Sequence, residues 1–293
     1  MSVAEMSGNR LTVAIGTTAS KPGDLAGNLG QIQRLARQAG AVGCDVLLTP
    51  EMSATGYGGY SEVLALAEPA GDGPVYKGLA DIATQSGVIV LAGFVERAGT
   101  LRHIAHYAVE PSGRFTVQRK MRATPAERPL DPAVTLFYDD TEEIGHVVPG
   151  EERFVPLWIR GVPCAIVICA DWGVRGRTEI LQRQGARMIF LPTGAGGKRE
   201  ERVDDDELST VEGRDKYARL VDERPYTGRG ALDCRDNGWG FAAVNLCGFD
   251  GKQRYHGGSG SIVTPQGDVV AVIPACPNFT RAGPRLALAT LHF

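Results

Sequence analysis

The amino-acid sequence predicts a layered α/β protein with mixed β-sheets, built as one domain. Apolar segments of strand length alternate with amphipathic helical segments in the first half of the chain and again around residue 169. This alternation favours parallel strands joined by helices, whereas turn signals elsewhere favour antiparallel hairpins. No Pro/Ser-rich linker divides the 293 residues, and hydrophobic residues make up 43% of them, which is enough for a sizeable core.

The N-terminal half opens with a strand and a well-bounded helix. We expect a buried strand over Leu11–Ile15 and then a helix that Asp24 caps and that Gly40 and Gly43 end. Apolar residues recur between these ends at helical spacing, at Leu25, Leu29, Ile32, Ala36 and Ala39. Further elements are expected at 45–49 (strand), 75–85 (helix) and 88–94 (strand), and at strands 107–110 and 114–120 around a Pro-Ser-Gly turn.

The C-terminal half is richer in strands. An apolar strand is expected over Cys164–Ile168. It is followed by a short helix at 178–184 and by strands at 188–191, 241–244, 260–264, 269–273 and 286–291. Residues five apart on a strand point to opposite faces, so we expect Cys164 not to join Cys169 in a disulfide or a metal site.

Residues 198–228 form a charged insertion within this domain. Its first ten residues read KREERVDDDE, and such a run is usually a solvated helix or loop. Its position directly after Pro192-Thr193-Gly194 keeps open a second interpretation, a flap beside an active site. At the start of the chain, we expect a flexible tail over 1–10 and a single domain over 11–293.

Composition and patterning argue against several classes of protein. The chain has 31 Lys and Arg against 34 Asp and Glu, a net charge of −3, so no basic excess is present to bind nucleic acid. The apolar runs are too short for a transmembrane helix, and residues 1–10 lack the apolar stretch of a secretory signal. Six cysteines without structural-zinc spacing predict a reduced, cytoplasmic protein.

Three chemically active side chains lie at the ends of predicted strands. Glu51 follows an apolar strand in LLTPEMSATGY, Lys120 ends a hairpin strand in TVQRKMRATPAER, and Cys169 ends a strand in VPCAIVICADWG. Each has an ordinary alternative: a solvated acid, a surface lysine and a small buried hydrophobe. Together they suit acyl transfer, because a carboxylate can accept the thiol proton and an ammonium can stabilise an oxyanion.

Other hydrolase classes find less support in the sequence. His103 and His106 are the only closely spaced histidines, and on a strand they would face opposite ways, which disfavours a metal site. His256 would be needed for a Cys-His hydrolase, but its glycine-rich surroundings are typical of a turn beside the site. The HGGSGS stretch does not supply the GxSxG motif of a serine hydrolase.

These segments, in this order, resemble the nitrilase superfamily of carbon-nitrogen hydrolases over nearly the whole chain. The three segments above resemble the family's glutamate, lysine and cysteine motifs, and Glu127 matches a second glutamate seven residues after the lysine. QGARMIFLPTGAG and GFAAVNLCGFDGKQRYHGGSGSIVTPQGDVVA are similar to two further family segments. One departure is that ADWGVRGRTE lacks the Pro-Glu that commonly follows the cysteine.

The resemblance implies a four-layer α-β-β-α sandwich with two mixed sheets and a Glu51-Lys120-Cys169 triad. It implies that Cys169 forms a thioester, that Glu127 supports Lys120 and the substrate, and that the backbone N–H of Ala170 binds the oxyanion. It implies no cofactor and no metal, a small-molecule substrate, and a homodimer or higher homo-oligomer. The candidate substrate-pocket residues are Tyr57, Asp171, Trp172, Thr193 and Asn245.

The substrate subclass follows from the residues after the nucleophile. Cys169-Ala170-Asp171 resembles amidases and carbamoyl hydrolases, whereas true nitrilases usually have Cys-Trp-Glu, so an amide or N-carbamoyl substrate is favoured. Nitrile hydrolysis and a catalytically silent scaffold are the alternatives. Arg175 and Arg177 are candidates to bind a substrate carboxylate, and solvent-facing arginines are an equally good interpretation.

Overall fold

Two six-stranded mixed sheets form the centre of the protein in a computed structural model. The structure describes residues 9–122, 124, 127, 154–197, 202–222, 227–252, 254–278 and 281–293. The first sheet has the order β15 (Leu286–His292), β1 (Arg10–Gly16), β2 (Val46–Leu48), β3 (Ile89–Ala98), β4 (Leu101–Val109) and β5 (Phe115–Arg119). The second has the order β14 (Val269–Ile273), β13 (Gly260–Val263), β10 (Gly240–Asn245), β8 (Met188–Thr193), β7 (Val162–Ile166) and β6 (Leu157–Ile159).

Both sheets mix parallel and antiparallel pairs, as the sequence predicts. The strands joined by helices pair in parallel, β1 with β2, β2 with β3, β7 with β8 and β8 with β10. The hairpin β4–β5 is antiparallel and turns at Gly113, which has a φ of 83°. The carboxyl ends of β2 and β7, where Glu51 and Cys169 follow, belong to the parallel part of their sheets, where side chains from different strands can meet.

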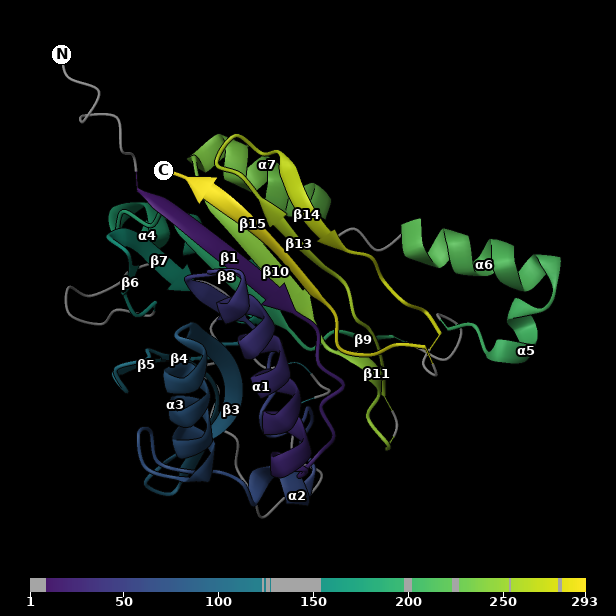
Figure 1. The fold of residues 1–293 in the computed structure, drawn as a ribbon, viewed down its shortest axis with the longest axis horizontal. Helices are drawn as coiled ribbons and strands as arrows, with labels where there is room; N and C mark the ends of the chain where they lie inside the picture. Colours follow the sequence, from purple (N-terminus) through teal and green to yellow (C-terminus); the bar gives the residue numbers. More distant parts are fainter. Residues whose placement is uncertain are drawn as a thin grey trace.

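Helices cover the outer face of each sheet, which completes the four expected layers (Figure 1). Helices α1 (Leu25–Ala41) and α3 (Pro74–Ser86) pack on the first sheet, and α4 (Arg177–Arg183) and α7 (Thr227–Asn237) pack on the second. The α1 helix begins where Asp24 accepts a hydrogen bond from the Gly27 N–H at 3.0 Å, as expected for its N-cap.

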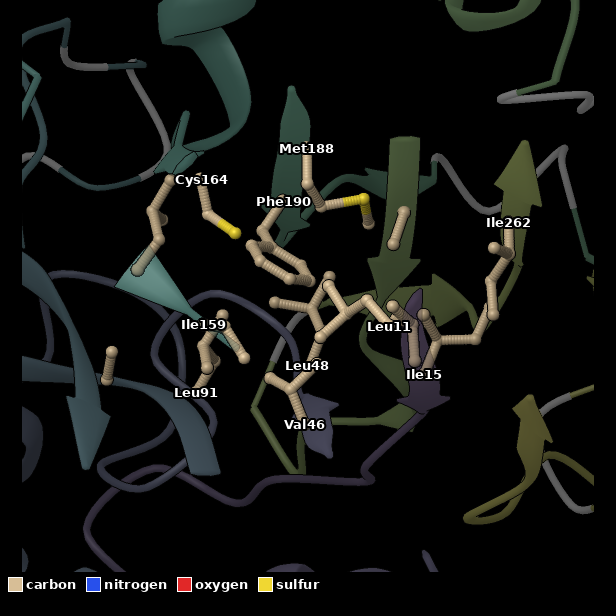
Figure 2. Packing of buried hydrophobic residues seen from close by; sticks show 14 of the residues in the cluster. Leu11, Ile15, Val46, Leu48, Leu91, Ile159, Cys164, Met188, Phe190 and Ile262 are labelled. Carbon is tan, nitrogen blue, oxygen red and sulfur yellow. The ribbon is translucent and has the colours of Figure 1, made fainter. Parts of the chain in front are cut away.

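The two sheets face each other across a continuous apolar core (Figure 2). Alternate residues of β1 and β2 point into it, such as Leu11, Ile15 and Leu48, and they meet Cys164 and Phe190 from the second sheet. Their neighbours in the sequence face the helices instead, because side chains alternate along a strand. Burial of both sheet faces explains why these strands are almost continuously apolar.

Several elements differ from the sequence expectations. The structure adds α2 (Ser61–Leu64) and a small sheet of β11 (Cys247–Phe249), β12 (Tyr255–Gly257) and β9 (Gly196–Gly197). Arg10, expected in the flexible tail, already pairs with His292 in β1, whereas residues 1–8 lie outside the described residues. No helix in the described ranges combines the length and apolar character needed to cross a membrane.

The prediction that Cys164 and Cys169 face opposite ways was wrong. The side chains alternate between the two faces through Ile168, and the alternation breaks at Cys169, whose φ of 48° is in the left-handed region. Both cysteines contact the core between the sheets, and both are free thiols.

Within the charged insertion, most of the described residues are helical. Helices α5 (Asp205–Leu208) and α6 (Val211–Asp222) stand away from the two sheets in Figure 1, whereas α7 lies against the second sheet. The base of this arm is held by Val203, whose N–H donates to Pro277 O, and by the ion pair of Asp205 with Arg281 at 3.2 Å. Residues 198–201 and 223–226 of the insertion lie outside the described residues.

Candidate active site

The structure brings Glu51, Lys120 and Cys169 to one place between the sheets. Lys120 Nζ donates to Glu51 Oε1 at 2.7 Å and to Glu127 Oε1 at 2.5 Å, and all three side chains are buried. Cys169 interacts electrostatically with all three of them. Buried carboxylates and ammonium groups persist only when they are paired, so this arrangement compensates the cost of burying each charge.

Glu51 is positioned by a tight turn that packs against β3. Met52 has a φ of 52°, and Ala54 N donates to Gly93 O at 2.9 Å. A side chain at Gly93 would overlap the Met52 backbone nitrogen, so glycine allows the turn to approach β3 closely. The turn thereby directs the Glu51 carboxylate into the interior instead of into solvent.

Lys120 follows β5 directly, and hydrogen bonds fix the chain on both sides of it. Its own N–H donates to Ile104 O at 2.8 Å. The next two N–H groups, of Met121 and Arg122, donate to the Asp171 carboxylate at 3.1 and 2.8 Å. Asp171 lies two residues after Cys169, so its carboxylate ties the cysteine turn to the lysine segment.

Cys169 occupies an unusual backbone conformation at the start of a short 3₁₀ helix, Cys169–Gly173. Its φ is 48°, in the left-handed region that residues other than glycine rarely adopt, and Ile168 before it is still extended. Residues held in this way are often found at functional sites, because the surrounding structure must stabilise the strained turn. Cys169 as a residue keeps partial access to solvent.

Burial and neighbouring charges shift the titration of all three groups. Burial raises the pKa of the Glu51 carboxyl to about 7, opposed by the Lys120 ammonium and reinforced by Glu127. Burial acts to lower the pKa of Lys120, but the negative charges of Glu51, Cys169 and Glu127 hold it well above its usual value. Burial, reinforced by the Glu51 charge, raises the pKa of the Cys169 thiol above its usual value.

Glu51 and Glu127 differ in their hydrogen bonds. Glu127 Oε1 accepts from Lys120 and from the Tyr57 hydroxyl at 2.7 Å, and its Oε2 accepts from the Thr124 N–H at 3.0 Å. Glu51 Oε2 is buried and has no hydrogen-bond partner in the described part of the chain. Glu51 therefore keeps one oxygen available to exchange a proton, whereas Glu127 is held by three donors.

Thr193 and Asn245 hold the loop that follows β8. Thr193 Oγ1 donates to Val244 O and to Asn245 Oδ1, each at 3.2 Å. Asn245 Nδ2 donates to Ala195 O at 2.9 Å, and His256 Nδ1 lies 3.2 Å from the same oxygen. Thr193 and Asn245 thus hold residues 193–195 beside Glu51. Among the pocket candidates, Tyr57 contacts the charged centre directly, through its hydrogen bond to Glu127.

Two other pocket candidates have different surroundings. The Asp171 carboxylate is engaged by backbone N–H groups, as described above. The Trp172 ring lies edge-on to Phe241, 5.3 Å between centroids, in the core behind the second sheet. Arg177 stacks 3.7 Å from the Trp172 ring centroid and pairs with Asp233 at 3.2 Å, so its guanidinium is committed within the protein, whereas Arg175 is exposed.

His103 and His106 do not converge on the charged centre as metal ligands. On β4, His103 pairs with Glu96 of β3 and His106 pairs with Gly93 of β3. His106 is fully buried, and burial lowers the pKa of its imidazole to about 3. No group of three or more His, Cys, Asp or Glu side chains in the described ranges is arranged to hold a metal ion.

Sequence reasoning missed the contribution of Gly194, and it expected His256 in a turn beside the site, whereas His256 lies in strand β12. Gly194 is buried at the centre, and a side chain there would overlap the Tyr57 ring. His256 packs edge-on to Tyr57, 5.5 Å between centroids, and burial lowers its pKa to about 4, so it is neutral. The Pro192-Thr193-Gly194 and HGGSGS segments were noticed in the sequence, but nothing local connects them to Glu51.

The chain is similar to several known proteins. Residues 12–207 match the model of the carbon-nitrogen hydrolase family. A hydrolase in the pqqF 5′ region of Pseudomonas protegens is 28% identical over 265 residues, 89% of this chain and 78% of that protein. A nitrilase of Pyrococcus abyssi is 26% identical over 56% of this chain and 58% of its own length. N-carbamoylputrescine amidase of Arabidopsis thaliana is 21% identical over 85% of this chain and 77% of its own length.

The fold is also that of a solved enzyme structure. An amidase from Nesterenkonia sp. superposes with a TM-score of 0.67 at 18% identity, covering 98% of this chain and 92% of that one. The sandwich of two mixed sheets and outer helices is therefore a nitrilase-type fold, as the sequence resemblance implied. With two thirds of its length matched by the family model, the chain belongs to the carbon-nitrogen hydrolase family of enzymes.

Proposed function

We propose that this enzyme hydrolyses the C–N bond of a small amide or N-carbamoyl compound through a thioester on Cys169. The observation that carries the proposal is the buried Lys120 ammonium, which bridges Glu51 and Glu127 beside a cysteine on a left-handed turn. Such a cluster is expensive to bury, and acyl transfer uses each of its members.

In the first step, Glu51 Oε2 accepts the Cys169 proton as the sulfur attacks the carbonyl carbon. The S–H bond breaks, an S–C bond forms, and the carbonyl oxygen becomes an oxyanion. Lys120 and the Ala170 N–H stabilise that oxyanion; the Ala170 N–H has no acceptor among the described residues, so it is free for this role. Protonated Lys120 needs no proton transfer to act as a fixed positive charge.

In the second step, Glu51 returns the proton to the leaving nitrogen. The C–N bond breaks, ammonia or an amine departs, and the acyl group remains on the sulfur. Glu51 then takes a proton from a water molecule that attacks the thioester carbon. A C–O bond forms, the C–S bond breaks, the acid product departs, and Glu51 returns the proton to the sulfur. A carboxyl whose pKa is about 7 is well matched to this alternation of base and acid near neutral pH.

The residues after the nucleophile favour amide or carbamoyl substrates over nitriles. Asp171 resembles the amidase pattern, and here its role is to bind the backbone of the Lys120 segment. The similar proteins include an amidase, a carbamoyl-compound amidase and a nitrilase, so nitrile hydrolysis is the second candidate. A homo-oligomeric assembly and a cytoplasmic location remain predictions from the sequence.

The test is an ammonia-release screen of the purified protein over primary amides, N-carbamoyl amino compounds and nitriles. We expect turnover of an amide or carbamoyl compound, and a mass shift on Cys169 equal to the acyl group. The matched control is Cys164→Ala, since Cys164 is a buried free cysteine of the same sheet outside the charged cluster. Turnover of nitriles alone would favour the second candidate, and absence of any Cys169 adduct would contradict the thioester.

A further inference from the structure

Two buried hydroxyl groups close the turn that carries Glu51. Thr49 and Ser53 lie on either side of Pro50-Glu51-Met52, and both residues are fully buried. Thr49 Oγ1 and Ser53 Oγ are 2.8 Å apart, so a hydrogen bond joins the residue before Pro50 to the residue after Met52. Glu51 is therefore the middle residue of a segment that a side-chain hydrogen bond closes.

The direction of each bond follows from the number of protons available. A hydroxyl group has one proton to donate, and a carbonyl oxygen can only accept. Thr49 Oγ1 gives its proton to Leu91 O at 2.8 Å. Ser53 must therefore donate to Thr49, and Ser53 Oγ in turn accepts from the Gly93 N–H at 3.1 Å. One chain of hydrogen bonds thus runs from Gly93 through both hydroxyls to Leu91.

This chain takes the place of a regular strand contact along β3. The Thr49 N–H donates to Leu91 O at 2.9 Å, which continues the parallel pairing of β2 with β3 by one residue. At Gly93, two residues further along β3, the acceptor is the side-chain oxygen of Ser53. The parallel ladder therefore stops where the Glu51 turn begins, and hydroxyl groups make the connection that backbone carbonyls make in the rest of the sheet.

The second half of the turn is anchored on another element. Ser20 Oγ donates to Ser53 O at 2.7 Å, and Asn28 Nδ2 donates to Ala54 O at 3.1 Å. Ser20 and Asn28 are buried; the first precedes α1 and the second lies within it. The Glu51 turn is thus held by β3 on one side and by the α1 region on the other.

Glu51 depends on this backbone support because its carboxylate has few contacts of its own. Lys120 donates to Oε1, and Oε2 has no hydrogen-bond partner in the described part of the chain. Met52, the next residue, has a left-handed φ of 52°, a conformation that the surrounding structure must stabilise. Relaxation of the turn would therefore move the Glu51 carboxylate relative to Lys120.

We propose that Thr49 and Ser53 are positioning residues that hold Glu51 in place for proton transfer. Their hydroxyls bond to each other and to β3, so they act on the reaction through the backbone of the turn. The proposal rests on the proposed thioester function, in which Glu51 is the proton acceptor, but the position of the Glu51 carboxylate can be measured without a substrate.

The first experiment removes one hydroxyl while keeping the size of the side chain. Thr49→Val breaks the hydrogen-bond chain, whereas Thr49→Ser keeps the hydroxyl. Thr12→Val is the matched control, because Thr12 forms a hydroxyl pair with Thr290 at 3.0 Å in the same sheet. Thr12 precedes the residues of β1 that pair with β2, so it lies at the opposite end of these parallel strands from Glu51.

We expect Thr49→Val to lower kcat about tenfold or more with KM within about twofold of wild type, because a small misplacement of a catalytic group slows the chemical step. Thr49→Ser should keep kcat near the wild-type value. Thr12→Val should lower the melting temperature as much as Thr49→Val does and leave kcat unchanged. Equal kcat for the two valine variants, or an equal loss in Thr49→Ser, would overturn the proposal.

The second experiment needs no substrate. Crystal structures of the wild type and the Thr49 variants give the distance from Glu51 Oε1 to Lys120 Nζ, which is 2.7 Å here. We expect Thr49→Val to displace the carboxylate by about 0.5 Å or more, and Thr49→Ser to leave it in place. An unmoved carboxylate in Thr49→Val would contradict the positioning role.

Ser53→Ala removes the other hydroxyl and gives the same measurement where Thr49→Val does not fold. If the wild-type enzyme hydrolyses no amide or carbamoyl compound, the function proposed above fails. The distances between Glu51 and Lys120 in the variants still decide whether the hydroxyl pair of Thr49 and Ser53 positions Glu51.

Discussion

The carboxylate of Asp171 binds the backbone N–H of Met121 through both of its oxygens, at 3.1 Å each. This contact joins the turn that carries Cys169 to the segment that carries Lys120, although the two lie in different sheets. The distance between nucleophile and ammonium therefore depends on a residue that does not contact the reacting atoms. Small misplacements of catalytic groups are costly, so we expect this link to matter for rate as well as stability.

We predict that Asp171→Asn lowers both stability and kcat. The amide retains one acceptor oxygen but presents N–H groups where the carboxylate accepted, leaving a buried backbone donor unpaired. The expected cost is about 1–3 kcal/mol of unfolding free energy, with a fall in kcat that exceeds any change in KM. Denaturant unfolding and steady-state kinetics measure the two effects; full activity in the variant would show that the link does not position the centre.

Cys169→Ala should abolish turnover and leave the fold intact. Only the thiol is lost, and removal of one small group costs at most a few kcal/mol by the precedent of core truncations, whereas the nucleophile has no replacement. Ammonia release and circular dichroism are the measurements. Wild-type rates in the alanine variant would rule out Cys169 as the nucleophile.

Glu51 and Glu127 should respond differently to replacement by Gln. Glu51→Gln is expected to prevent acylation, because the one carboxylate oxygen without a partner is the proposed proton acceptor. Glu127→Gln should retain alkylation of Cys169 and lose turnover by about 10²-fold through a misplaced Lys120 or substrate. Single-turnover detection of the Cys169 thioester separates the two, and acylation of Glu51→Gln at the wild-type rate would require their roles to be exchanged.

Stability should fall as the pH rises through the range in which Glu51 titrates. Its pKa is about 7 in the folded protein against an ordinary value of 4.5, so the folded state binds this proton more tightly than the unfolded state. The contribution is fully present below pH 4.5 and is lost by about pH 7; Asp171, whose pKa burial also raises to about 7, acts in the same direction. Between pH 4.5 and about pH 7, the unfolding free energy of Glu51→Gln should fall by on the order of 3 kcal/mol less than that of the wild type. Denaturant unfolding at a series of pH values measures this difference. Replacement of the exposed Glu179 by Gln is the control, and identical slopes for all three proteins would contradict the shift.

The arm formed by α5 and α6 should not control catalysis. Both helices stand away from the sheets (Figure 1), and the Asp205–Arg281 pair at their base is exposed on both sides. Exposed pairs contribute little to stability, so Arg281→Ala is expected to leave kcat and KM within about twofold of wild type. A severalfold rise in KM would instead support the flap interpretation of residues 198–228.

Local sequence signals predicted most of the strands and helices and pointed to three reactive residues. The Asp24 cap and the helical spacing of the apolar residues after it predicted α1, and Pro111-Ser112-Gly113 predicted the β4–β5 hairpin. The motifs around Glu51, Lys120 and Cys169 pointed to the candidate triad. Such signals work because capping, turn formation and side-chain alternation depend on residues a few positions apart.

Only the tertiary structure decided how distant segments meet. The pairing of β1 with β15, the bond from Asp171 to the lysine segment and the approach of Gly194 to Tyr57 join residues far apart in the chain, and no local pattern encodes those partners. The left-handed turn at Cys169 likewise ended the strand alternation that had placed it opposite Cys164. The sequence by itself determined which groups could react; the packing of two sheets determined which carboxylate oxygens the Lys120 ammonium contacts, because these contacts form only when the whole core closes around them.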